Sequence, residues 1–127
     1  MIVLDTSVAI AALTGHHAAQ EAVGRQRLVA PHLIDVEIAH ALRGLVIGGR
    51  IAEADADTVL DVWARLAIDR VAHAPLVPRI WELRENLTAY DAALVAVAEV
   101  QGVALLTADR RLATAPGPRC AIELIPL

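Results

Sequence analysis

Two aspartates follow short apolar segments, at the points where predicted strands end. Asp5 closes the opening segment MIVLD, and Asp109 follows VALLTA, two residues beyond Thr107. Each could be the N-cap of the next helix, because an aspartate there accepts a hydrogen bond from a free backbone N–H. In an open parallel sheet, however, ligands bind beyond the carboxyl ends of the strands. The two carboxylates are therefore also candidates for one functional site.

Two further acidic residues lie in the early turns of predicted helices, on or beside the apolar faces. Glu37 does so in PHLIDVEIAHALRGL, and Asp91 in NLTAYDAALVAVAEVQG. Asp91 has a second interpretation, a capping box in which Thr88 is the N-cap and Asp91 follows three residues later. Asp35 lies nearer the polar side of its helix, and we expect it to be solvated or to support the site from outside.

Asp5, Glu37, Asp91 and Asp109, the four acids, together predict a bound cation. Buried carboxylates without a partner are costly, and the chain has no lysine to offset several of them. Its arginines near these motifs fall mostly on polar faces. Mg²⁺ and Mn²⁺ take oxygen ligands, whereas zinc requires His or Cys at short spacing, which the five histidines and single cysteine do not offer. The four acids therefore predict an Mg²⁺ or Mn²⁺ site.

The elements that must position these acids alternate along the chain. Strands are predicted at 2–4, 27–30, 69–74, 103–107 and 121–125, and helices at 6–14, 17–25, 32–47, 52–67, 76–86, 88–101 and 110–115. Strands separated by helices need crossover connections, which predicts an α/β fold with a mainly parallel central sheet covered on both faces. The length of 127 residues predicts a single domain over 1–127.

Composition limits the partners. Hydrophobic residues make up 57% of the chain, which predicts apolar surface beyond the core and hence self-association or a protein partner. No uncharged apolar run approaches about 18 residues, and the N-terminus does not resemble a signal peptide. The lone Cys120 agrees with a reducing compartment, so we expect a cytoplasmic protein without a membrane segment. We expect Trp63 and Trp81 to be core or interface residues rather than base-stacking platforms.

The net charge of -4 provides no general basic surface for nucleic acid. A polyanion would have to be held by metal or by a local set of arginines, for which Arg43, Arg110 and Arg111 are candidates; a solvated helix face is the other interpretation of these three. An acid-only metal cluster on an α/β sheet suits phosphodiester hydrolysis, in which the metal activates water and stabilises the entering and leaving oxygens.

Four segments, IVLDTSV, APHLIDVEIAHALR, LRENLTAYDAALVAVAE and VALLTADRRL, resemble the PIN-domain ribonucleases, and most closely the VapC toxins of bacterial toxin–antitoxin pairs. The similarity covers nearly the whole chain. It implies a PIN-like three-layer α/β/α fold, an RNA substrate, and Mg²⁺ or Mn²⁺ held by the four acids. It also implies a homodimer and a VapB-like antitoxin that blocks the site. Thr6, Ser7 and Thr107 match hydroxyl positions that support the acids in the family, although local capping is an alternative.

Other classes with an acidic site fit the sequence less well. A receiver domain would need paired N-terminal acids and a late lysine, and the chain has no lysine. A phosphatase with an aspartyl nucleophile would show an Asp-x-Asp pair, whereas Ser7 stands two residues after Asp5. The remaining alternative is a PIN-like protein that binds RNA or a partner without cleaving.

Overall fold

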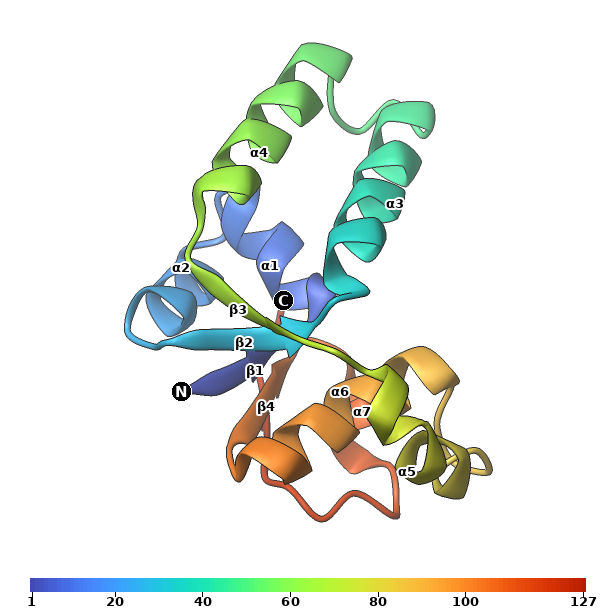
Figure 1. Cartoon of the computed structure of the whole chain (residues 1–127). Helices are drawn as coiled ribbons and strands as arrows, with labels where there is room; N and C mark the ends of the chain where they lie inside the picture. The colour runs from blue at the N-terminus through green and yellow to red at the C-terminus, as the bar shows by residue number, and fades with distance from the viewer.

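The computed structural model describes all of residues 1–127 and is built on a five-stranded sheet (Figure 1). Its strands are β1 (Ile2–Leu4), β2 (Leu28–Pro31), β3 (Ile68–Val71), β4 (Ala104–Thr107) and β5 (Ile122–Leu124). They lie in the order β3-β2-β1-β4-β5, and every neighbouring pair is parallel. The predicted α/β fold with a parallel sheet is confirmed.

Helices cover both faces of this sheet and complete three layers (Figure 1). One face is covered by α1 (Thr6–Leu13), α2 (His17–Gly24), α3 (Ile34–Ile47) and α4 (Glu53–Arg65), and the other by α5 (Val77–Glu82), α6 (Ala89–Gln101) and α7 (Arg110–Thr114). Because successive strand residues point to opposite faces, Ile2 and Leu4 join the core under α1–α4 while Val3 joins the core against α6. None of the helices combines the length and apolar character needed to cross a membrane.

Several helices and strands are shorter than predicted. The helix predicted at 32–47 begins at Ile34, since the His32 N–H still bonds the Val71 carbonyl at the end of the β2–β3 ladder. The strand predicted at 69–74 ends at Val71 and gives way to the 3₁₀ turn η1 (Ala74–Leu76). The helix predicted at 76–86 ends at Glu82, and a turn over the next residues leads into α6.

A polar cluster ties α3 and α4, which extend together away from the sheet, to β3 (Figure 1). Asp35 accepts hydrogen bonds from Trp63 Nε1 at 2.8 Å and from Arg70 Nε and Nη2 at 2.6 and 2.8 Å. The hydrogen bond from Arg70 lowers the pKa of the Asp35 carboxyl. Asp35 is therefore an ion-pair partner joining three elements, while its side chain stays 42% exposed to solvent. Trp63 is buried, as predicted.

The helical connections between the strands lie on different faces of the sheet on the two sides of β1. The crossovers from β1 to β2 and from β2 to β3 carry α1–α4, and those from β3 to β4 and from β4 to β5 carry α5–α7. Helices leaving the adjacent strands β1 and β4 therefore depart to opposite faces, and in folds of this kind ligands bind beyond the strand ends at such a point. Asp5 leaves β1 at this point, and its N–H bonds the Leu106 carbonyl at 3.1 Å.

Candidate active site

Asp5 is buried at the carboxyl end of β1, and its side chain does not cap α1. Oδ2 accepts hydrogen bonds from the Ser7 hydroxyl at 2.8 Å and from the Thr107 hydroxyl at 2.7 Å. Oδ1 accepts none within the chain. The helix-cap alternative is therefore wrong for this side chain, which is held by two hydroxyls and keeps one oxygen free.

The same two hydroxyls connect Asp5 to the segment that follows β4. Ser7 Oγ accepts a hydrogen bond from the Ala108 N–H at 3.1 Å, and Thr107 Oγ1 accepts one from the Asp109 N–H at 3.0 Å. Thr107 is fully buried. Each hydroxyl thus donates a hydrogen bond to the Asp5 carboxylate at the end of β1 and accepts one from a backbone N–H that follows β4. These bonds fix the ends of β1 and β4 relative to each other.

Asp109 and Asp91 both lie in helix-capping arrangements. Asp109 is the N-cap of α7, and its Oδ1 accepts a hydrogen bond from the Arg111 N–H at 2.9 Å. Thr88 is the N-cap of α6 and accepts from the Asp91 N–H at 3.2 Å. Capping accounts for only one oxygen of Asp109, and Thr88 caps through the backbone of Asp91. Both carboxylates therefore keep oxygen available to a ligand.

Glu37 lies half-buried in the first turn of α3 and is electrostatically linked to two of the other acids. Burial, reinforced by the charges of Asp5 and Asp91, raises the pKa of Glu37 to about 7. Burial also raises the pKa of Asp91, and the charges of Asp5 and Asp109 add to the effect while Arg111 opposes it. Carboxylates influence each other in this way only when they lie near one another, so the fold brings the four acids into one region.

None of the four acids takes part in an ion pair, and the one cation that acts on them is Arg111, whose charge lowers the pKa of Asp91. As the side chains lie, no three His, Cys, Asp or Glu residues are arranged as a ready metal site. The donor set nevertheless fits Mg²⁺ or Mn²⁺, since it offers only carboxylate oxygens, some of them free of protein hydrogen bonds. A divalent ion would offset both the cost of burying these charges and their mutual repulsion, which together raise the pKa values of Glu37 and Asp91.

The other predicted site residues surround the acids in different ways. Thr6 Oγ1 is buried without a hydrogen-bond partner, and Thr6 lines a hollow together with Glu37. Arg43, Arg110 and Arg111 are exposed and form no ion pair. Their guanidinium groups are therefore available to an anion from solvent, but no contact fixes their orientation.

Comparisons with known proteins place the chain in a family. The PIN-domain family model matches residues 2–118. Ribonuclease VapC9 of Mycobacterium tuberculosis (strain ATCC 25618 / H37Rv) is 45% identical over 126 residues, which cover 99% of this chain and 99% of that protein. The chain belongs to the VapC ribonucleases of the PIN-domain family.

Solved structures agree with this VapC assignment at the level of the fold. PAE2754 from Pyrobaculum aerophilum superimposes with a TM-score of 0.74 at 29% identity, covering 95% of this chain and 81% of its own. A toxin–antitoxin complex from Klebsiella pneumoniae contains a chain that superimposes with a TM-score of 0.65 at 18% identity, over 94% of this chain and 99% of that one. The predicted PIN-like three-layer fold is confirmed.

The raised pKa of Glu37 predicts how the stability of this VapC chain depends on pH in chelator. The ordinary value of 4.5 rises to about 7 on folding, so the neutral carboxyl favours the folded state. The contribution is complete below about pH 4.5 and is lost as the pH rises through about 7. We expect the free energy of unfolding to fall by on the order of 1–3 kcal/mol over this range, after allowing for partial solvent screening.

Urea unfolding in EDTA at several pH values measures this decline, and Glu37→Gln tests its origin. Glutamine is neutral at every pH, so the variant should lose stability less steeply between about pH 5 and pH 8 than the parent. Asp91 contributes in the same direction in both proteins, since its pKa is also raised. Equal slopes in the two proteins would show that Glu37 titrates normally and does not face the other acids.

Sequence reasoning missed two features beside the acids. Tyr90, immediately before Asp91, and His40, one turn after Glu37, line the hollow that contains Glu37. Trp81 is exposed, so the part of the expectation that placed it in a core was wrong. The chain holds only two Trp and one Tyr, with no Phe. For Tyr90 and Trp81, the small number of aromatic residues was the signal that the sequence offered, because so rare a residue on the surface often marks a binding site. No such signal was available for His40.

Proposed function

We propose that this VapC ribonuclease hydrolyses RNA phosphodiester bonds with Mg²⁺ or Mn²⁺ held by Asp5, Glu37, Asp91 and Asp109. The observation that carries the proposal is a set of four mutually coupled carboxylates without an ion-pair partner, at the point where the sheet connections change face. When bound, the metal would activate water and stabilise charge on the entering and leaving oxygens. Substrates with phosphate oxygens suit a site of this donor chemistry.

The residues around the acids have separate roles in this proposal. Ser7 and Thr107 hold one oxygen of Asp5 so that the other faces the ligand, which removes the need to order that side chain during each turnover. Thr6 offers a buried hydroxyl at the Glu37 hollow. Arg43, Arg110 and Arg111 are candidates to bind phosphates flanking the scissile bond, because all three are exposed and free of ion pairs.

We further propose that the chain works in the cytoplasm as the toxin of a pair, inhibited by a VapB-like antitoxin, and that it is a homodimer. The antitoxin proposal is supported by the likeness to VapC9 and to the chain from the Klebsiella complex. The homodimer is supported by the exposed apolar side chains, since a surface of this kind is usually covered by another protein. Examples on α3 and α4 are Val36, Ile47 and Val62.

Expression of this chain alone should arrest bacterial growth, and co-expression of a small protein encoded beside it should relieve the arrest. Colony counts after brief induction should fall by about 100-fold or more if cleavage of an essential RNA is responsible, and sequencing of RNA 5′ ends should reveal new termini. The matched control is the Asp91→Asn chain, expressed to the same level, which should be harmless.

Purified protein separates the toxin from its alternatives. Cleavage of mixed cellular RNA that requires Mn²⁺ or Mg²⁺ and stops in EDTA supports the proposal. Cleavage by a chain that is harmless in cells would indicate a processing nuclease instead of a toxin. RNA binding without cleavage under any divalent ion would indicate a PIN-like binding protein, and would overturn the catalytic role of the four acids.

A further inference from the structure

Two of the three aromatic residues lie on the surface in one hollow. Trp81 of α5 is 66% exposed and Tyr90 of α6 is 60% exposed, whereas Trp63 is in the core. Trp81 and Tyr90 line the same hollow of about 390 Å³, and Val77 and Ile80 also line it. Exposing large aromatic rings to water is unfavourable. A pair of them in one concave surface therefore indicates something that binds there.

This hollow, which we call the Trp81 hollow, adjoins the acidic site. The neighbouring hollow is lined by Thr6 and Glu37, and the two hollows share Leu33 and Tyr90 as lining residues. Tyr90 also precedes Asp91 directly in the first turn of α6. A molecule bound at the acids could therefore continue across Tyr90 into the Trp81 hollow without leaving the protein surface.

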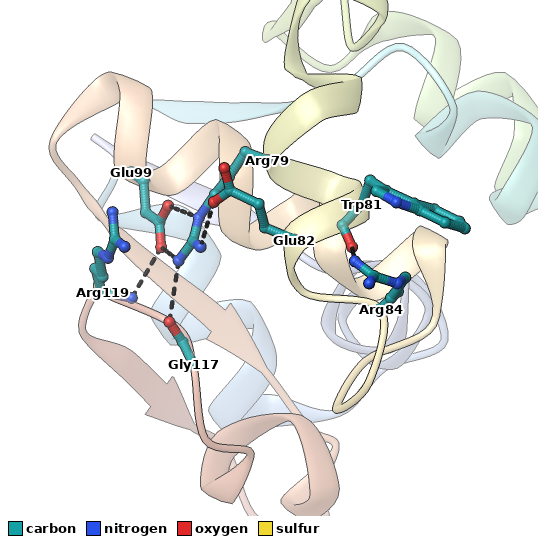
Figure 2. A network of polar contacts seen from close by, with 7 residues as sticks. All are labelled: Arg79, Trp81, Glu82, Arg84, Glu99, Gly117 and Arg119. Carbon is teal, nitrogen blue, oxygen red and sulfur yellow. Dashed lines mark hydrogen bonds and ion pairs between the residues drawn. The ribbon is translucent and has the colours of Figure 1, made fainter.

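The charged side chain that contacts the Trp81 ring is a cation. The Arg84 guanidinium lies 4.7 Å from the centre of the Trp81 ring and donates a hydrogen bond to the Trp81 carbonyl at 2.9 Å (Figure 2). No carboxylate pairs with Arg84. Arg79, by contrast, is neutralised by Glu99 at 2.8 Å and Glu82 at 3.1 Å.

The lining of the Trp81 hollow adds no negative charge of its own. No acidic residue lines it, and His73 is its only titratable group apart from the Tyr90 phenol. Around the acids themselves a polyanion is repelled until metal binds, but here an uncompensated arginine lies against an exposed aromatic ring. This combination is typical of surfaces that stack bases while attracting the phosphate backbone.

We propose that the Trp81 hollow binds an unpaired nucleobase of the RNA substrate, next to the nucleotide that is cleaved. In contrast to the expectation from the sequence that Trp81 is a core or interface residue, Trp81 and Tyr90 supply ring faces for stacking. Arg84 holds the indole and attracts the adjoining phosphate. The inference rests on the proposed RNA cleavage and adds a substrate-positioning site to it. It also explains how a chain with net charge -4 binds RNA through contacts outside the metal site. The competing occupant is a second copy of this chain.

The test measures cleavage of a 5′-fluorescein-labelled single-stranded decaribonucleotide containing one mapped cut site, with Mn²⁺ in excess. Trp81→Ala should raise KM roughly 5- to 150-fold, the range expected for one lost stacking contact, with a smaller change in kcat. Trp81→Phe should restore most of the loss, because it keeps a ring. Val100→Ala, an equally exposed apolar residue near the other end of α6, should match the parent enzyme.

An abasic scan identifies the base that stacks. Removing the base at one substrate position should weaken the parent enzyme as much as Trp81→Ala does, and the two changes together should cost little more than either alone. Additive losses at every position would overturn the proposal. An unchanged KM for Trp81→Ala, in a preparation whose parent cleaves normally, would also overturn it while leaving the ribonuclease function intact.

Light scattering decides between RNA and a second copy of the chain. The parent and Trp81→Ala should have the same molar mass at micromolar concentration. A parent dimer that becomes a monomer on Trp81→Ala would make the hollow a subunit interface and overturn the proposal. If the parent enzyme itself fails to cleave any RNA, the proposed function fails first, and that result is distinct from every outcome above.

Discussion

Asp5→Asn should lower the rate of RNA cleavage by about 100-fold or more and leave the metal-free protein at least as stable as the parent. Asn keeps the shape of Asp, and its Oδ1 can still accept hydrogen bonds from Ser7 and Thr107. The substitution removes the negative charge of Asp5, which raises the pKa values of Glu37 and Asp91 in the parent. It also removes a charged metal ligand, and loss of one charge-stabilising group in an active site commonly costs 10²–10³ in rate.

Thermal melts in EDTA and then in Mn²⁺ separate the two effects. A ligand that binds only the folded state raises its melting temperature, so Mn²⁺ should stabilise the parent much more than Asp5→Asn. The matched control is Asp57→Asn on α4, an exposed aspartate without an ion pair, which should cleave RNA and respond to Mn²⁺ like the parent. A variant several degrees less stable in EDTA, with an undiminished Mn²⁺ response, would show that Asp5 is only structural.

Thr107→Val should destabilise the protein by about 1–3 kcal/mol and also reduce cleavage. Valine has nearly the same shape, but the fully buried position then lacks the hydroxyl that donates to Asp5 Oδ2 and accepts from the Asp109 N–H. A buried N–H loses its acceptor and a carboxylate loses a donor. Because the two aspartates belong to different strand ends, the variant should loosen both candidate ligands at once.

Urea unfolding and single-turnover cleavage measure the two consequences of this change. Thr107→Ser keeps the hydroxyl, so it should retain most of the cleavage rate even where it loses some packing. Thr114→Val at the exposed end of α7, whose hydroxyl bonds only the Arg110 carbonyl, should be close to neutral in both assays. A fully active Thr107→Val would show that these hydrogen bonds do not position Asp5 and Asp109.

The parallel sheet, and the placing of strand-end residues at one edge of it, could be predicted because they depend on order along the chain. Short aliphatic segments alternating with helical ones leave few topologies, and crossover connections make the strands parallel, so that their carboxyl ends lie at the same edge of the sheet. That reasoning was enough to select Asp5 and Asp109. Glu37 and Asp91 could be selected because their helices are long enough for an apolar face to be recognised. Both helices exceed three turns.

The contacts that hold the site could not be predicted in the same way. Thr107 and Asp5 are separated by 102 residues, and only the β1–β4 register brings the hydroxyl to Oδ2. The ion pair of Asp35 could not be predicted because the helical period does not reveal that Arg70 will face it from β3. Trp81 lies in a helix of 6 residues, too short for a periodic pattern to assign a face.

The pairing of β1 with β4 has a consequence for the timing of toxicity. The four acids are at positions 5, 37, 91 and 109, so a nascent chain shorter than 109 residues lacks at least one of them. β2 can pair with β1 early, but the other neighbour of β1 is β4, which is present only once residues 104–107 have been made, and such distant pairings are slow to form. A nascent chain on the ribosome therefore stays without the complete acidic site until this late segment has been made and has paired with β1. That delay leaves an interval in which an inhibitor can bind first.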